Sequence, residues 1–407
     1  MTRRTRQTVQ PTLARVPDAA LRRELESVVE SLPGPGASLG KTQIRSLHRN
    51  QRLLRFASLN GSIHDRISVL DDSLASPGEV RVDRIEPRLI PVSSAQERLL
   101  FTTATLTWSV PVSAGFGRRM RFLVRDEQNG KLVGIIGLTD PVFNLRPRDR
   151  WIGWCSEDRK KRLVHVMDAF VLGSLPPYSL ILGGKLVALL ATSREVCAQF
   201  RRRYAGTEGL ISGQQKDARL VLLTTTSALG RSSVYNRLSI PGSVKYITDA
   251  ERDSVGSWFT QGYGHFHINE CLFRRMVRFL ADCGHRYAEG YRFGQGPNWR
   301  IRVIRQTCVE LGLKPDALLQ HGVRRQVFVV PLAGNARAFL RGNCARPRYH
   351  NMKVAEITAF WRERWAEPRS QRCPSWLEWD KSQFLEQLAE LRDAAVAEGK
   401  PAPSTPP

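Results

Sequence analysis

The stretch RRMRFLVRDEQNGKLVGIIGL, residues 118–138, carries the clearest local structural signal in this chain. Two runs of alternating apolar residues flank the pair Asn129-Gly130, which is favoured where a tight turn needs positive φ angles. The stretch therefore predicts a β-hairpin, and the rest of the fold can be worked out from it.

The segments after the hairpin alternate between strand and helix patterns. We expect a strand in LVHVMDAFVL (163–172), one long helix in LGGKLVALLATSREVCAQFRRRYA (182–205), a strand in ARLVLLTTT (218–226), a short helix in GRSSVYNRL (230–238) and a strand in VKYIT (244–248). This order predicts an α+β fold in which helices flank a central mixed sheet.

Composition shifts divide the chain into four expected parts. They are a helical N-terminal module (1–78), an α/β domain (80–255), a basic C-terminal α/β segment (256–350) and a helical tail (351–407). Asp18 is suited to cap the first helix, and Pro77-Gly78 closes the first module. The last residues, EGKPAPSTPP, have the composition of a disordered end.

Charge is the most unusual feature of the composition. The 407 residues include 62 Lys and Arg against 38 Asp and Glu, a formal net charge of +24. Residues 271–350 alone hold 15 cations and 4 acids, so much of the surplus lies in a segment that is expected to fold. Such a surplus indicates affinity for a polyanion, either nucleic acid or an anionic membrane surface.

Membrane attachment is the weaker of these alternatives, because no apolar run approaches the roughly 20 residues of a spanning helix. The first residues lack the apolar core of a secretory signal. Seven cysteines are spread without a C-x-x-C pair, so neither a disulfide framework nor a zinc ribbon is expected. A cytoplasmic protein with reduced thiols is the prediction.

Three segments combine arginine with aromatic residues, a pattern suited to clamping phosphates and stacking bases. They are DPVFNLRPRDRWIGW (140–154), GQGPNWRIRVIRQTCVELG (294–312) and HGVRRQVFVVPLAGNARAFLRG (321–342). In the first segment, nearby Asp residues could instead neutralise the arginines in a structural network. The predicted nucleic-acid-binding residues are Arg148, Arg150, Trp151, Trp299, Arg300, Arg302, Arg305, Arg324 and Arg325.

Asp168 lies in the middle of the apolar strand pattern. A carboxylate buried there is costly unless it is paired, and such residues often belong to functional sites. The alternative is that it pairs with an arginine or caps the backbone. No metal site and no cofactor are assigned, and His265 and His267 are interpreted as polar residues that face a groove.

The order of elements from 118 to 248 resembles the GNAT acyltransferase superfamily. This resemblance implies that the main helix presents its first N–H groups, at Gly183, Gly184 and Lys185, to an anionic cofactor. Tyr235 falls where many such enzymes carry a general acid. On this hypothesis Asp168 and Tyr235 are catalytic residues. They and Arg231, in the hydroxyl-rich turn TTTSALGRSS (224–233), converge on a cleft between splayed strands 164–172 and 219–226.

Several strings in the chain resemble the DruA-like family of the bacterial Druantia anti-phage system. They include WSVPVS (108–113), GLTDPVFNL (137–145), RDRWIGW (148–154), PPYSLILGGKLVALLA (176–191), TTTSALGRSSVYNRL (224–238), GHFHI (264–268) and GPNWRIRVIR (296–305). The resemblance implies a role in multi-gene phage defence beside a large helicase-like partner. The family supplies no agreed activity, so it assigns no catalytic residue.

Two functions stay open at this point. One is a sensor or adaptor that binds nucleic acid, DNA being the expected partner, and that works with other proteins of the defence system. The other is a GNAT-like acyl- or group-transfer enzyme acting on nucleic acid or a nucleotide. The usual GNAT phosphate loop, Gln/Arg-x-x-Gly-x-Gly/Ala, is not present in that form, which favours the first.

Overall fold

The computed structural model forms two compact units, which we describe separately. One comprises Met1–Ser38 and Gln261–Val323, and the other comprises Leu39–Thr260 and Arg324–Pro407. The structure describes residues 18–33, 39–57, 63–113, 115–208, 215–248, 258–260, 262–290 and 297–399. The predicted disordered end, from residue 400 onward, lies outside the described residues.

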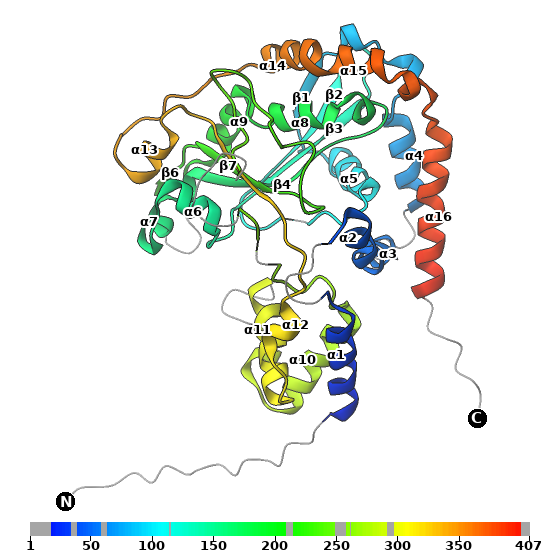
Figure 1. Cartoon of the computed structure of the whole chain (residues 1–407), viewed down its shortest axis with the longest axis vertical. Helices are drawn as coiled ribbons and strands as arrows, with labels where there is room; N and C mark the ends of the chain where they lie inside the picture. The colour runs from blue at the N-terminus through cyan, green and yellow to red at the C-terminus, as the bar shows by residue number, and fades with distance from the viewer. Residues whose placement is uncertain are drawn as a thin grey trace, which may run out of the picture. The chain divides into compact units, whose positions relative to one another are not determined.

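The larger unit is built on a six-stranded mixed sheet in the order β1-β2-β3-β4-β7-β8 (Figure 1). These strands are β1 (Pro87–Pro91), β2 (Arg119–Asp126), β3 (Leu132–Thr139), β4 (Val166–Ser174), β7 (Leu222–Thr226) and β8 (Val327–Pro331). Neighbouring strands are antiparallel except for β4 and β7, which are parallel. β5 (Ala205–Glu208) and β6 (Gln215–Asp217) form a separate pair. The predicted α+β class with a mixed sheet is confirmed, whereas the GNAT-like detail stays a prediction.

The predicted hairpin is confirmed as β2 and β3. The two strands pair in antiparallel register, with Phe122 opposite Ile136. Gly130 in the connecting turn has a φ of +70°, a conformation that glycine adopts without steric cost. The parallel pair of β4 and β7 requires a crossover connection. Two helices provide it, α8 (Gly183–Leu190) and α9 (Arg194–Tyr204).

The two faces of the sheet have separate cores. On one face, Met167, Leu223 and Phe328 belong to the same buried cluster as the apolar residues of α8. On the other face, Val166 and Val329 lie in a cluster with residues of α6 and α13. The remaining helices of this unit are α2 (Lys41–Leu47), α3 (Arg49–Ala57), α4 (Ile63–Ser73), α5 (Ala95–Ala104), α6 (Arg146–Ile152), α7 (Ser156–Arg162), α13 (Ala336–Arg341), α14 (Val354–Trp361), α15 (Glu367–Arg372) and α16 (Lys381–Gly399).

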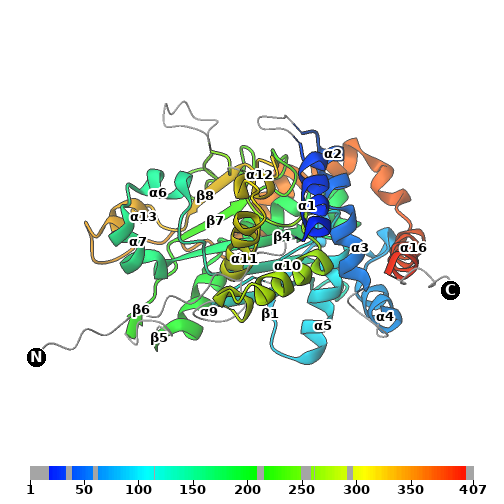
Figure 2. The same cartoon turned by 90° about the horizontal axis from the view of Figure 1, so that it is seen from below.

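The smaller unit is helical. It contains α1 (Ala19–Ser31), α10 (Glu270–Asp282), α11 (Pro297–Glu310) and α12 (Pro315–Leu319), which lie together in both views (Figures 1 and 2). Asp18 caps α1 as predicted, since its Oδ1 accepts a hydrogen bond of 2.8 Å from the backbone N–H of Leu21. Leu21 and Leu25 of α1 share one buried core with Phe273, Trp299 and other residues of α10 and α11.

Three expectations about local structure are wrong. The single helix expected at 182–205 is two helices, because the Ser193 hydroxyl accepts from the N–H of Val196 and starts α9 as a new helix. Residues 233–237 form turns instead of a short helix. Residues 244–248 make only isolated bridges, such as Ile247 with Val329, because β8 takes the place beside β7.

Helix length and composition also bear on the membrane alternative. Within the described ranges, no helix combines the length and the apolar character that crossing a bilayer requires.

Candidate nucleic-acid interface

Arg325 lies two residues before β8 and against a buried histidine. Its Nη2 is 3.2 Å from Nε2 of His48, whose Nδ1 is 2.9 Å from Oε1 of Gln51. Because a guanidinium only donates, His48 accepts at Nε2 and donates its own proton from Nδ1 to Gln51. Burial lowers the pKa of His48, and the charge of Arg325 lowers it further. His48 is therefore a neutral acceptor near pH 7.

The positive charges of Arg52 and Arg325 have no neutralising carboxylate beside them in the described ranges. Nε of Arg325 and Nε of Arg52, one helical turn after His48, are buried and have no hydrogen-bond partner there. Neither guanidinium has a carboxylate within 4.0 Å in the described ranges. Burial lowers the pKa of both groups. Cations held this way lack the counter-charge that usually offsets their desolvation.

Two further arginines lie near Phe259 beside this group. The guanidinium carbons of Arg231 and Arg324 lie 6.0 and 5.5 Å from the centre of its ring. Both arginines are exposed. Gly230 lies against the Ile44 side chain and the Arg324 carbonyl, which brings the Arg231 turn next to α2. We call His48, Arg52, Arg231, Arg324 and Arg325 together the Arg325 site.

Arg148 was predicted to bind nucleic acid but is fully buried. It pairs with Asp149 at 2.7 Å and donates to the carbonyls of Val142 and Phe143, both at 2.9 Å. This is the structural network that the nearby Asp residues had suggested as the alternative. Arg148 thus holds a loop and has no surface to offer a ligand.

The neighbours of Arg148 are placed differently. Arg150 is exposed, whereas Trp151 is half-buried with the guanidinium of Arg337 5.6 Å from its ring centre. Trp151 already stacks with a cation of its own chain, and Arg150 keeps an accessible side chain.

The predicted residues of α11 divide into buried and exposed groups. Trp299 is buried and donates to the carbonyl of Tyr287 at 2.6 Å. Arg300 lies over Phe273, 3.8 Å from the ring centre, and pairs with Glu270 at 2.8 Å. These two residues stabilise the helical unit.

Arg302 and Arg305 are exposed on α11 and each reaches a tyrosine hydroxyl. Arg302 lies 3.4 Å from the hydroxyl of Tyr287, and Arg305 lies 2.6 Å from that of Tyr263. Arg305 also lies 3.4 Å from Oδ1 of Asp316. The helical unit therefore presents two exposed arginines on α11, each beside a tyrosine hydroxyl.

Asp168 is half-buried in β4 and accepts a 2.6 Å hydrogen bond from the hydroxyl of Thr224. Burial raises the pKa of Asp168 to about 6, against the opposing effects of the Thr224 hydrogen bond and the Arg148 charge. The side chain shares its face of the sheet with Val166 and Val329, because alternate residues of a strand point the same way.

Tyr235 lies on the opposite face. Its ring stacks on Tyr246 at 5.4 Å between centres and meets the edge of Phe328 at 5.3 Å, and Phe328 belongs to the core beneath α8. Its hydroxyl lies 3.4 Å from the carbonyl of Leu172. The common cleft expected for Asp168 and Tyr235 is therefore not formed, because the sheet separates the two side chains. Burial raises the pKa of Tyr235 to about 12.

The predicted helix start is confirmed at Gly183, the first residue of α8. A Cβ at Gly183 would lie 2.6 Å from the carbonyl of Tyr178, so glycine permits this close packing. Gly184 faces Val234, and Nζ of Lys185 donates to the Val234 carbonyl at 3.0 Å. The helix start is thus joined to the turn that carries Tyr235. Whether it binds a cofactor stays a prediction.

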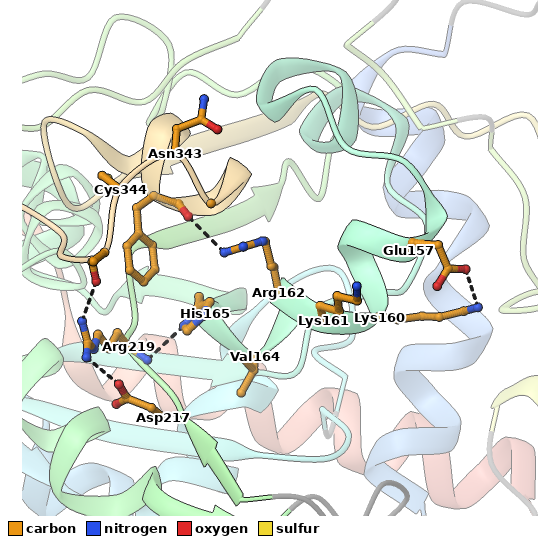
Figure 3. Close-up of a pocket in the computed structure, with 13 residues that line it drawn as sticks. Glu157, Lys160, Lys161, Arg162, Val164, His165, Asp217, Arg219, Asn343 and Cys344 are labelled. Atoms are coloured by element: carbon orange, nitrogen blue, oxygen red, sulfur yellow. Dashed lines mark hydrogen bonds and ion pairs between the residues drawn. The ribbon is translucent and has the colours of Figure 1, made fainter.

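A cavity of about 950 Å³ in the larger unit was missed by the sequence reasoning (Figure 3). Its lining residues include Glu157, Lys160, Lys161, Arg162, Val164, His165, Asp217, Arg219, Phe339, Gly342, Asn343, Cys344 and Ala345. We call it the α7–α13 cavity. The run of four cations at residues 159–162 is the signal that could have identified it. In the part of the chain that the structure covers, no three metal-binding side chains come together.

The raised pKa of Asp168 predicts how stability depends on pH. The folded protein holds the carboxyl proton up to about pH 6, whereas the unfolded chain releases it near its ordinary value of 3.8. Stability is therefore lost as the pH rises through this window. Asp168→Asn should raise the free energy of unfolding at pH 7 by up to about 3 kcal/mol, since each pKa unit corresponds to about 1.4 kcal/mol.

Urea unfolding of wild type and Asp168→Asn at pH 4, 5, 6 and 7 measures this effect. The two curves should converge at pH 4 and separate above it. A variant that is less stable than wild type at pH 7 would contradict the account, because it would mean that the ionised carboxylate is a net stabiliser.

The chain is similar over most of its length to one known protein family. A family model described as Druantia protein DruA matches residues 38–342. A protein named Druantia protein DruA, from Escherichia coli (strain UMEA 4076-1), is 46% identical over 351 residues, which cover 86% of this chain and 84% of that protein. No solved structure matches the chain. The resemblance found in the sequence is thus confirmed: the chain belongs to the DruA family and is a component of the Druantia anti-phage defence system.

Proposed function

We propose that this Druantia component binds nucleic acid, with DNA as the principal partner, through the Arg325 site. The observation that carries the proposal is the pair of half-buried arginines Arg52 and Arg325, whose Nε atoms are buried without a hydrogen-bond partner and without a carboxylate in reach in the described ranges. A buried cation costs free energy unless an anion accompanies it. A phosphate of a nucleic-acid backbone supplies that anion.

The residues around Arg52 and Arg325 are suited to bind a polymeric anion. Arg231 and Arg324 are exposed and both lie near Phe259, so they extend the positive charge from the interior to the surface. Arginine binds phosphate through a planar fork of donors, and an aromatic ring beside it can stack on a base. The net charge of +24 adds long-range attraction for any polyanion.

The exposed arginines of α11 are a second candidate contact. Arg302 and Arg305 reach the hydroxyls of Tyr287 and Tyr263. Their guanidinium carbons lie 5.9 and 5.7 Å from the centres of these rings, so the rings already contact cations of their own chain. Guanidinium groups held at the surface in this way suit phosphates. We propose that these two arginines assist the Arg325 site and do not replace it.

Group transfer is the alternative function, and the order of the first elements of the sheet favours it. The hairpin is followed by β4, the crossover helices and β7, as the GNAT resemblance implies, but the short helix and the last strand expected at 230–248 are not formed. The separation of Asp168 from Tyr235 removes the expected catalytic pair, however. Nucleic-acid binding is therefore the better-supported function.

The proposal also concerns partners and location. A defence component that binds DNA would act in the cytoplasm, together with other Druantia proteins. We include a helicase-like protein among these partners, because a nucleic-acid-binding subunit could deliver a substrate to it.

Binding to DNA should weaken steeply with salt, since every neutralised phosphate releases counterions. Filter binding of the full chain to a duplex oligonucleotide at several salt concentrations measures this. The double variant Arg231→Ala/Arg324→Ala should bind about tenfold or more weakly, and its log–log salt slope should be smaller by about two. Because both side chains are exposed, the fold should persist.

The matched control is Arg84→Ala/Arg88→Ala, which removes two exposed arginines near and on β1, at the other edge of the sheet. Its affinity should stay within about twofold of wild type, because these arginines lie outside the proposed contact and salt screens distant exposed charges. Wild-type protein without affinity tighter than about 10 µM at low salt would overturn the proposed function.

We further propose that Asp168 is needed for phage defence. A carboxylate with a raised pKa lowers the stability of the fold at pH 7, so a purely structural role does not explain it. Asp168→Asn should fold and yet protect cells less well, measured as plaque formation in cells that carry the complete defence system. Thr224→Val is the control, since it removes the hydroxyl that binds Asp168 and keeps the carboxyl group. Full protection by a folded Asp168→Asn protein would assign Asp168 a structural role.

A further inference from the structure

The α7–α13 cavity carries more positive charge at its centre than at its ends. In Figure 3 the pair of Glu157 with Lys160 and the pair of Asp217 with Arg219 lie on opposite sides of Arg162. The first pair is 2.6 Å apart and the second 2.5 Å apart. Each carboxylate at the ends is therefore already matched by a cation.

Lys161 and Arg162 occupy the middle of the cavity without such a match. Neither has a carboxylate within 4.0 Å among the residues that the structure covers. Lys161 is exposed, and Arg162 is half-buried, with its Nη1 3.3 Å from the carbonyl of Phe339. Asp158 and Glu157 lie near enough to feel these charges but form no ion pair with them. An anion bound between the two cations would therefore reduce their mutual repulsion.

The position of Arg162 depends on Gly342, which ends α13. A Cβ at Gly342 would lie 2.2 Å from Nη2 of Arg162, so any other residue would displace the guanidinium. Gly342 also has a φ of +83°, a conformation that favours glycine. The backbone at the end of α13 thus leaves room for this one guanidinium.

His165 adds a neutral donor to the same wall. Its Nδ1 accepts from the backbone N–H of Arg219 at 3.2 Å, so the ring proton is on Nε2. Burial, aided by the charge of Arg162, lowers the pKa of His165 to about 4. At neutral pH the ring therefore offers a hydrogen bond without adding charge.

From this arrangement we propose that the α7–α13 cavity binds a phosphate group of a nucleic-acid backbone, held by Lys161 and Arg162. The inference rests on the proposed function and adds a second contact, on the face of the sheet covered by α6 and α13. Several of its lining side chains, such as Glu157, Lys161 and Asp217, are exposed. Such an open site would leave a small ligand largely in water, whereas a backbone that continues past it is anchored elsewhere.

The test compares full-length wild type with Lys161→Ala/Arg162→Ala by fluorescence anisotropy, using a labelled duplex of about 20 base pairs. The variant should bind about tenfold or more weakly, with a log–log salt slope smaller by about two. Arg84→Ala/Arg88→Ala, which removes the same charge elsewhere, should change affinity by less than about twofold. Lys161→Glu, at an exposed position, repeats the test without disturbing half-buried Arg162.

The outcomes separate this inference from the proposed function. Unchanged binding by both cavity variants, while Arg231→Ala/Arg324→Ala loses affinity, would overturn the cavity site alone. Wild type that binds no duplex would overturn both proposals. Inorganic phosphate at 10 mM, with chloride reduced to keep ionic strength constant, should not abolish the difference between wild type and variant. If it does, the cavity takes a free phosphate and the backbone contact is wrong.

Discussion

The parallel pairing of β4 with β7 is the contact on which the rest of the larger unit depends. Four residues of each strand pair, Val166 to Ala169 with Leu222 to Thr225. Parallel strands cannot be joined by a hairpin, so α8 and α9 must cross one face of the sheet. That crossover leaves the other face to α6 and α13 beside β4, β7 and β8, and to α5 beside β2 and β3, and it determines which side chains share a core. Asp168 and Tyr235 lie on opposite faces of this sheet and therefore belong to different cores.

Arginine has two different roles in this protein. They differ in whether a carboxylate of the same chain neutralises the guanidinium charge. Arg148 is fully buried, but Asp149 and two carbonyl groups satisfy it, so it stabilises a loop. Arg325 is held beside a neutral histidine with no carboxylate near it in the described chain. Both arginines looked alike in the sequence. Only the second arrangement leaves positive charge that a polyanion could neutralise, and Arg162 in the α7–α13 cavity shares this property.

Local patterns predicted the parts of the fold that depend on local interactions. The hairpin around Gly130, the Asp18 cap and the start of α8 follow from residues close in sequence. The position of β8 could not be predicted in this way, because it joins β7 from about 100 residues further along the chain. Likewise, the proximity of Arg325 to His48 depends on long-range packing. A pattern of arginines does not reveal which of them will meet an aspartate.

Hydrogen–deuterium exchange of the full chain with and without a duplex oligonucleotide tests most directly whether unneutralised arginines mark the nucleic-acid interface. Bound DNA excludes water from the backbone it covers and reduces local opening. We predict slower exchange at residues 41–52, 230–233 and 324–326 around the Arg325 site, and at 159–165 around the α7–α13 cavity. Loop 142–145 near Arg148 should be unchanged. Protection confined to that loop, or to surfaces without these arginines, would contradict the account.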